Sequence, residues 1–193
     1  MRIKKLVVAI SAASVLWLNQ DAQARTYDID SVHSSISFWI DHIGFGPILG
    51  VAYEYSGQFD FAADNLAASK VEAKLKVASI NTGSKRRDAD IQGADWFNAA
   101  EFPEITFVGK SFVQTGASTG NIVGKMTIAG VSRDVTLDVK FNKEADNPFD
   151  KSHVAGFSAR TTILRSDFGM KTYLPVVGDK VDIVIEVEGA AKK

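Results

Sequence analysis

Apolar and polar side chains alternate one by one along much of this chain, a period that is typical of half-buried β-strands. The clearest run is Lys70–Val77, in which Val71, Ala73 and Leu75 share one face and three lysines and a glutamate occupy the other. The same alternation returns in five further segments: 35–41, 51–61, 121–128, 133–141 and 179–188. Repeated alternation on this scale predicts one antiparallel sheet, closed or sandwiched, with an apolar inside and a hydrated outside.

The first 24 residues are expected to be a cleavable signal peptide. Met1–Lys5 is a basic start, Leu6–Leu18 is an apolar run, and Ala22–Ala24 fits the small-residue rule for the cleavage site. The apolar run is short for a membrane span, which disfavours a retained anchor. Cleavage after Ala24 would leave residues 25–193 as a single exported domain.

The composition narrows the classes of function. The chain has no cysteine, so it can form no disulfide and carry no lipid on a thiol. The leader holds Arg2, Lys4, Lys5 and Asp21, and its removal would change the net charge from −1 to −3. Because no basic stripe or Lys/Arg run follows, we expect no nucleic-acid partner.

Turn residues and strand spacing predict an all-β fold. Ser84 can cap a short helix that runs to about Gly93, and 94–102 reads as a helical or irregular turn that ends at Pro103. The remaining segments make about eight strands. Eight antiparallel strands with one helical excursion favour an up-and-down barrel, with one or two short helices near its mouth. Such a barrel can enclose one small ligand or be filled by its own side chains.

A membrane barrel is the alternative, because the alternating pattern alone permits the apolar face to point outward. In that case the charges of Lys70–Lys76 and of the other strands would crowd the lumen without partners. The aromatic residues are also spread along the strands, whereas membrane barrels gather them in two girdles. We therefore expect no stable membrane insertion.

One segment matches the nucleophile-elbow string G-x-S-x-G. It is Gly116–Gly120, with Ser118 as the serine, His153 downstream, and Asp134 and Asp138 between them in hydrolase order. An elbow needs a strand before it and a helix after it, but here another strand follows almost at once. A hairpin tip of small residues is therefore favoured, and a small serine hydrolase that uses Ser118 and His153 is kept as an alternative.

Histidines and charged residues give two further candidate sites. His33, His42 and His153 show no zinc-type spacing, so no metal site is expected. Arg87 and Asp88 belong to a polar cluster beside the predicted mouth. They either tie the helix to the barrel rim or meet the polar end of a ligand.

Aromatic and aliphatic residues at inward positions predict the inner wall. Small residues at nominally inward positions, Gly57, Ala73 and Gly124, would leave a barrel of this size underfilled, which favours a cavity. The expected apolar lining is Ile36, Phe38, Ile40, Phe45, Tyr53, Tyr55, Phe59, Phe107, Met126 and Ile128, and the expected polar rim is His42, Arg87 and Asp88.

Short motifs in a fixed order complete the pattern. They include Tyr27-x-Ile29-Asp30-x-x-His33-Ser34, Asp41-His42-Ile43-Gly44, Ala94-Asp95-Trp96-Phe97-Asn98, Phe102-Pro103-Glu104-Ile105-Thr106-Phe107 and Arg165-Ser166-Asp167-Phe168-Gly169. In these motifs the chain resembles the YceI family of exported, lipocalin-like isoprenoid-binding proteins. Two features depart from the family: Asp90 stands where a histidine is often found, and the loop 42–51 is unusually apolar.

The resemblance implies an eight-stranded antiparallel lipocalin-like barrel in the periplasm. Its lumen would hold a polyisoprenoid or a similar long-chain amphiphile, such as an isoprenoid quinone, for transport, storage or stress response. The resemblance implies a carrier, not an enzyme, with no cofactor beyond the bound lipid. We expect a monomer or a weak homodimer. A solid barrel that binds other molecules only on its surface is the third alternative.

Overall fold

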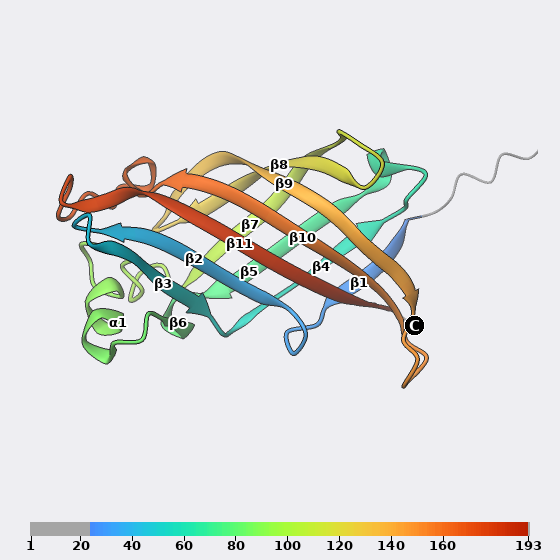
Figure 1. The fold of residues 1–193 in the computed structure, drawn as a ribbon, viewed down its shortest axis with the longest axis horizontal. Coiled ribbons are helices and arrows are strands. Elements are labelled where there is room, and N and C mark those ends of the chain that lie inside the picture. The colour runs from blue at the N-terminus through green and yellow to red at the C-terminus, as the bar shows by residue number, and fades with distance from the viewer. Residues whose placement is uncertain (1–23, 193) are drawn as a thin grey trace, which may run out of the picture.

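The computed structural model describes residues 24–192, which form a long barrel of antiparallel strands (Figure 1). Apart from Ala24, the predicted signal peptide lies outside the described residues. The strands are β1 (Arg25–Ile29), β2 (Ser35–His42), β3 (Gly46–Ala52), β4 (Tyr55–Phe61), β5 (Lys70–Lys76), β6 (Ile80–Asn81), β7 (Glu104–Gln114), β8 (Thr119–Ile128), β9 (Val131–Asp146), β10 (His153–Leu164) and β11 (Val177–Ala191). The helices are α1 (Lys85–Ile91) and the 3-10 turns η1 (Leu66–Ala68), η2 (Val77–Ser79) and η3 (Arg165–Phe168).

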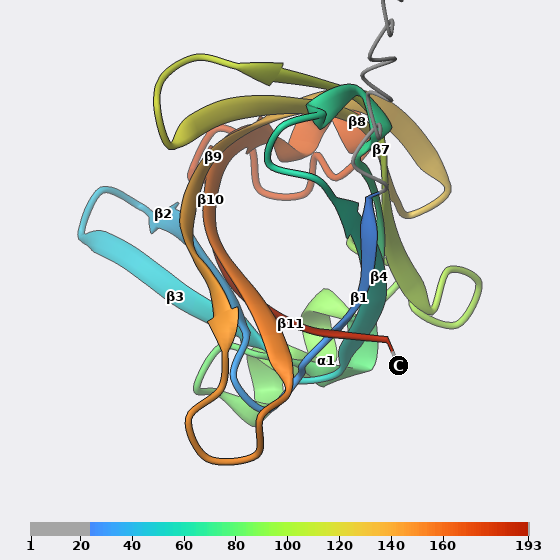
Figure 2. The ribbon, with the colours of Figure 1, turned by 90° about the vertical axis from the view of Figure 1, so that its right-hand side faces the viewer.

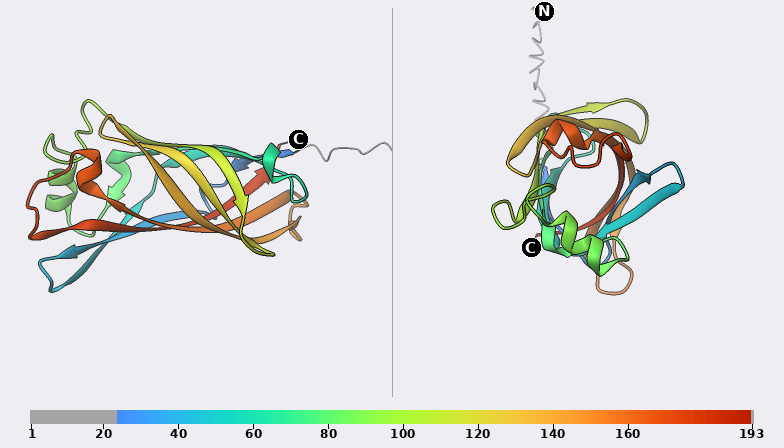
Figure 3. Two further views of the ribbon diagram at one scale, coloured as in Figure 1. Left: turned by 90° about the horizontal axis from the view of Figure 1, so that it is seen from above. Right: turned by 90° about the vertical axis from the view of Figure 1, so that its left-hand side faces the viewer.

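Eight of these strands close into a ring in the order β1, β4, β5, β7, β8, β9, β10 and β11. The first and last strands complete it, because Tyr27 pairs with Ala191 on one side of β1 and with Phe59 on the other. Figures 2 and 3 show the ring from its two ends. The predicted eight-stranded antiparallel barrel is confirmed.

The three remaining strands extend the wall at the end that carries α1. Strand β2 pairs with the early part of β11, with Phe38 opposite Ile183. Strand β3 pairs with β2, and the short β6 pairs with β3 through Ala52 and Ile80. The tip between β2 and β3 projects from the side of the ring (Figure 2).

Strand β5 shows how the alternating pattern orients the wall. Val71, Ala73 and Leu75 line the inside of the barrel, and Glu72 on the opposite face is exposed. Lys74 reaches Glu104 on the neighbouring strand at 3.1 Å. The apolar face therefore points inward, as the sequence predicted.

Helix α1 begins where the sequence predicts. The Ser84 side chain accepts a hydrogen bond from the N–H of Arg87 at 3.5 Å, and Asp88 lies in the first turn, where a carboxylate interacts favourably with the helix dipole. The helix ends at Ile91, which is buried against β3 and β6 in one of the core clusters. Residues 94–102 form turns without a further helix. No helix between residues 24 and 192 combines the length and the apolar character needed to cross a bilayer.

Candidate functional site

The barrel encloses a cavity of about 1060 Å³. This volume lies at the upper end of the range for small-molecule sites. Its wall is mainly aliphatic and aromatic, and it extends from α1 at one end to the β7–β8 hairpin and η1 at the other. This cavity contradicts the alternative of a filled, solid barrel.

Eight of the ten residues expected to line the lumen lie in the cavity wall: Ile36, Phe38, Ile40, Tyr55, Phe59, Phe107, Met126 and Ile128. The wall contains many apolar residues that were not singled out from the sequence, including Ile29, Val71, Ile105, Ile122, Leu137, Ile163, Ile183 and Ile185. These residues follow the same alternation along their strands. The sequence would therefore have identified them once the inward-facing positions of each strand were assigned. The two small positions Gly57 and Gly124 are not the source of the empty space, because Ile29 and Phe107 lie over them.

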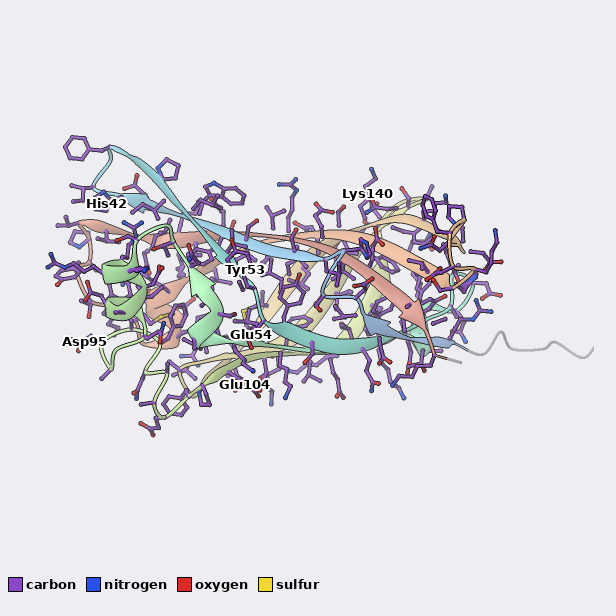
Figure 4. The ribbon with its side chains drawn as sticks, turned by 90° about the horizontal axis from the view of Figure 1, so that it is seen from below. His42, Tyr53, Glu54, Asp95, Glu104 and Lys140 are labelled. Atoms are coloured by element: carbon purple, nitrogen blue, oxygen red, sulfur yellow. The ribbon has the colours of Figure 1, made fainter. Side chains whose placement is uncertain are left out.

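Tyr53 does not line the cavity, which corrects the prediction. The expected single strand from Val51 to Phe61 is broken at Tyr53 and Glu54, and the inward face changes parity there. Ala52 faces inward before the break and Tyr55 after it, which leaves Tyr53 on the outer flank with 66% of its surface exposed (Figure 4). Substitution of Tyr53 by Asp should therefore leave cavity binding unchanged.

The prediction that Phe45 lines the cavity is also wrong. It lies at the tip of the β2–β3 turn and is exposed, outside the cavity wall. The turn is fixed by Asp41, whose carboxylate accepts the N–H of Gly44 at 3.0 Å, and by the N–H of Phe45, which bonds to the His42 carbonyl at 3.1 Å. The tip of the turn extends beyond the ring of strands, so the Phe45 side chain cannot reach the lumen.

The mouth beside α1 carries a group of charged and polar lining residues. His42 and Asp95 lie at this end (Figure 4) and reach the cavity together with Arg86, Arg87 and Asp90. These side chains could meet the polar end of a ligand. Asp88 does not line the cavity, which corrects its assignment to the rim.

Arg87 and Asp88 instead fasten α1 to the wall through Thr82. The Asp88 carboxylate accepts the N–H of Thr82 at 2.8 Å and its hydroxyl at 2.6 Å. The Arg87 guanidinium donates to the Thr82 hydroxyl and to the Thr82 carbonyl, both at 2.7 Å. Of the two roles considered for this pair, the structure supports the tie between helix and rim.

Arg165 is a buried wall residue that the sequence analysis did not single out. Only 2% of it is exposed, and its guanidinium donates to the carbonyls of Met170, Val177 and Gly178 at 2.8–3.0 Å. Its Cζ lies 5.0 Å from the centroid of the Trp96 ring, a cation–π contact. Burial lowers the pKa of Arg165 from its usual value. The residue thus anchors the β10–β11 loop beside the mouth.

The opposite end of the barrel has two different parts. Residues Gly116–Gly120 of the β7–β8 hairpin are mostly exposed and also line the cavity, so the cavity approaches the surface there. Beside them an aromatic cluster closes the lumen: Tyr27 stacks on Phe59 at 5.0 Å, and Phe157 meets Phe59 edge to face at 5.5 Å. The cavity therefore reaches the surface at two ends, at the mouth beside α1 and at the β7–β8 hairpin.

A hydrogen-bonded cluster lies behind this aromatic closure. The Tyr27 hydroxyl donates to the Glu144 carboxylate at 2.5 Å, and His153 contacts Glu144 at 2.9 Å and Asp146 at 2.7 Å. Burial, and then the bond to Glu144, raises the pKa of Tyr27 to about 12. Hydrogen bonds to Asp146 and Glu144 raise the pKa of His153. The cluster joins β1, β9 and β10 at this end of the barrel.

Ser118 and His153 are not brought together. The Ser118 carbonyl accepts the N–H of Phe141, whereas His153 pairs with Asp146, five residues further along β9. At about 3.3 Å per residue the two lie roughly 16 Å apart along that strand, far beyond the hydrogen-bond distance that a nucleophile and its base need. Within residues 24–192, no group of three or more His, Cys, Asp or Glu side chains is arranged to hold a metal ion.

The architecture and sequence together identify the relatives of this chain. The YceI-like domain model matches residues 27–189. The chain belongs to the YceI family. Protein YceI of Escherichia coli is 33% identical over 193 residues, which cover 99% of this chain and 100% of that protein.

Solved structures agree with this membership. BcnA of Burkholderia cenocepacia aligns with a TM-score of 0.76 at 26% identity, covering 83% of this chain and 98% of that one. A polyisoprenoid-binding domain from Saccharophagus degradans, implicated in plant cell wall breakdown, aligns with a TM-score of 0.64 at 13% identity, covering 86% and 98%. At that identity the second likeness bears on the fold alone.

Proposed function

We propose that this YceI-family protein binds a long-chain lipid in its barrel, with a polyisoprenoid or an isoprenoid quinone as the ligand class. The observation that carries the proposal is the cavity of about 1060 Å³ with an apolar wall that runs between both ends of the barrel. A linear chain fits such a space lengthwise. A compact polar metabolite would leave most of the wall without contacts.

Transfer of apolar groups from water supplies the affinity. Burial of about ten methylene-sized groups at roughly 0.8 kcal/mol each gives about 8 kcal/mol before the costs of binding, which corresponds to a micromolar dissociation constant. A longer chain would gain more. Polar anchors in the middle of the barrel are therefore not required.

The polar end of the ligand is proposed to lie at the mouth beside α1. Arg86, Arg87 and His42 reach the cavity there and can donate hydrogen bonds to the oxygens of a quinone or a phosphate. The cavity is lined by residues of one chain, so binding needs no second subunit. Size-exclusion chromatography with light scattering tests whether the protein is a monomer or a homodimer.

We propose a binding role without catalytic turnover, because Ser118 in the β7–β8 hairpin and His153 on β10 lie roughly 16 Å apart along β9. A fluorophosphonate probe checks this. Covalent labelling that disappears in Ser118→Ala would establish the hydrolase in its place.

Export to the periplasm is proposed from the basic start and apolar run of the first 24 residues. The intact mass of protein from an osmotic-shock fraction tests it. A mature chain that begins at Arg25 is expected, and a full-length chain retained inside the cell would contradict export.

The decisive experiment is mass spectrometry of an organic extract of the natively purified protein, compared with two variants. Ile183 lies in the cavity wall, and Val184 is its neighbour on the opposite face of β11. We expect a bound long-chain lipid in the wild type and in Val184→Glu, and none in Ile183→Glu. All three should show the same far-ultraviolet circular dichroism.

A second assay uses delipidated protein and all-trans-retinol, a fluorescent isoprenoid alcohol. Energy transfer from Trp96, which lines the cavity, reports occupancy. An absence of both co-purified lipid and saturable retinol binding in the wild type would overturn the proposal.

A further inference from the structure

Four exposed apolar side chains flank the mouth beside α1. They belong to the β2–β3 turn and to the loop that precedes β11, and we call them the apolar rim: Ile43 (47% exposed), Phe45 (89%), Tyr173 (69%) and Val176 (56%). Exposed apolar residues are ordinary when they are scattered singly. Here four of them gather at one opening of an apolar cavity, which calls for a specific explanation.

Strand pairing brings the two loops of the rim together. Val177 at the start of β11 pairs with His42 at the end of β2, so the loops leave neighbouring strands at the same end of the barrel (Figure 1). Tyr173 also lines the cavity, and its ring centroid lies 6.3 Å from that of Trp96. The rim is therefore continuous with the wall of the mouth.

The backbone holds the rim side chains outward. Ile43 and Tyr173 have φ angles of 61° and 60°, in the left-handed region that a β-branched or bulky residue rarely adopts. Each turn is closed by backbone hydrogen bonds, from Phe45 to His42 at 3.1 Å and from Val177 to Tyr173 at 2.9 Å. The tips are thus fixed features of the two loops.

We propose that the apolar rim docks the mouth onto a phospholipid bilayer, where its tips enter the interface and the cargo passes between bilayer and cavity. The inference rests on the proposed function. A long isoprenoid chain is almost insoluble in water, so its transfer is fast only if the mouth meets the membrane directly. Tyrosine and phenylalanine suit the boundary between headgroups and acyl chains.

The shape and charge of this end favour a bilayer over a protein partner. The rim is a set of separate projecting tips, whereas a stable protein interface needs a packed patch of about 800 Å² on each side. Charged groups at the mouth have mixed sign: Arg86 and Asp90 line the cavity, and Lys171 lines a neighbouring pocket together with Asp95. Adhesion should therefore depend on apolar insertion and only weakly on salt.

The test measures retinol transfer from the loaded protein to vesicles of phosphatidylethanolamine and phosphatidylglycerol. The rim variant is Phe45→Ser with Val176→Ser, two rim residues that do not line the cavity. The matched control is Phe149→Ser with Val32→Ser, which removes two exposed residues (93% and 81%) outside the rim loops. We expect the transfer rate of wild type and control to rise with vesicle concentration, and that of the rim variant to fall by about tenfold and lose this dependence.

The outcomes separate the two proposals. Equal transfer by all three proteins, with retinol binding intact, would overturn docking and leave lipid binding in place. A rim variant that changes only the oligomeric state, with unchanged transfer, would identify the rim as a contact between copies and overturn docking as well. A wild type that carries no co-purified lipid and also fails to bind retinol in solution would instead contradict the proposed function.

Discussion

The ring of Phe107 lies flat over Gly124 on the adjacent strand. A Cβ atom built on Gly124 would fall 2.2 Å from Cζ of Phe107 and 2.8 Å from the carbonyl oxygen of Val108. No side chain fits between the ring and the backbone. The glycine therefore lets a large aromatic side chain lie along the wall and keeps it out of the lumen.

Substitution Gly124→Ala should lower the free energy of unfolding by about 1–3 kcal/mol, because the ring must leave its position and overpack its neighbours. Urea denaturation measures the change. Gly156→Ala is the control, since a Cβ there meets nothing closer than 3.8 Å. Equal stability of the two variants would contradict the close fit.

Arg165→Met should destabilise the protein by about 3 kcal/mol or more, because it leaves the buried carbonyls of Met170, Val177 and Gly178 without a donor. Arg160→Met on the exposed face of β10 is the matched control and should cost little. Urea denaturation with tryptophan fluorescence follows both. Limited proteolysis then shows where stability is lost. Faster cleavage within residues 165–177 in Arg165→Met alone would support the anchoring role, and unchanged cleavage would argue against it.

Ala73→Phe should reduce lipid capacity without unfolding the barrel. Ala73 lies in the cavity wall, so the added ring would occupy space that a chain would otherwise fill. Glu72→Phe places the same ring on the outer face of β5. We expect retinol to bind about tenfold more weakly to Ala73→Phe and with unchanged affinity to Glu72→Phe. The added ring in the cavity would remove the contacts of about two methylene groups, and their loss of about 1.4 kcal/mol corresponds to a tenfold change. Equal binding by both variants would place the ligand elsewhere.

The cluster of His153, Glu144 and Asp146 should make stability depend on pH. The pKa of His153 is raised in the folded state by its bonds to Asp146 and Glu144, so its stabilisation is complete below about pH 6.5 and disappears as the pH rises through the folded pKa. Burial opposes ionisation of Glu144, but bonds from Tyr27 and His153 leave its pKa lowered, so its contribution is lost only in acid.

The difference in Tm between wild type and His153→Gln should therefore be largest near pH 5.5 and smaller at pH 8. Thermal unfolding followed by circular dichroism at the two pH values measures it. His42→Gln at the exposed mouth serves as the control substitution. A difference that grew from pH 5.5 to pH 8 would contradict the assigned direction.

The sequence was sufficient to predict the barrel, the inward direction of its apolar face and eight wall residues out of the ten that were named. Period-two alternation fixes which side chains share a face, and in β5 it placed Val71, Ala73 and Leu75 correctly. The error at Tyr53 arose because two non-strand residues shift the parity between β3 and β4, and apolar residues occupy both faces just before the break. A local irregularity of that length leaves no distinct signal in composition.

Longer-range features could not be predicted from the sequence. Arginine is usually exposed, so the burial of Arg165 depends on carbonyls that a loop presents after folding. The hydrolase alternative failed for a related reason. The order of Ser118 and His153 along the chain says nothing about their separation across β9, which the strand register sets.

The seam between β1 and β11 has a consequence for folding kinetics. Residues 27–29 pair with 189–191, so the ring cannot close until the last strand has been made. Such distant pairing slows folding, since a long loop must be ordered before the closing contacts form. A nascent chain would thus stay open throughout its synthesis, and the barrel would close only after its carboxyl end is free to pair with β1.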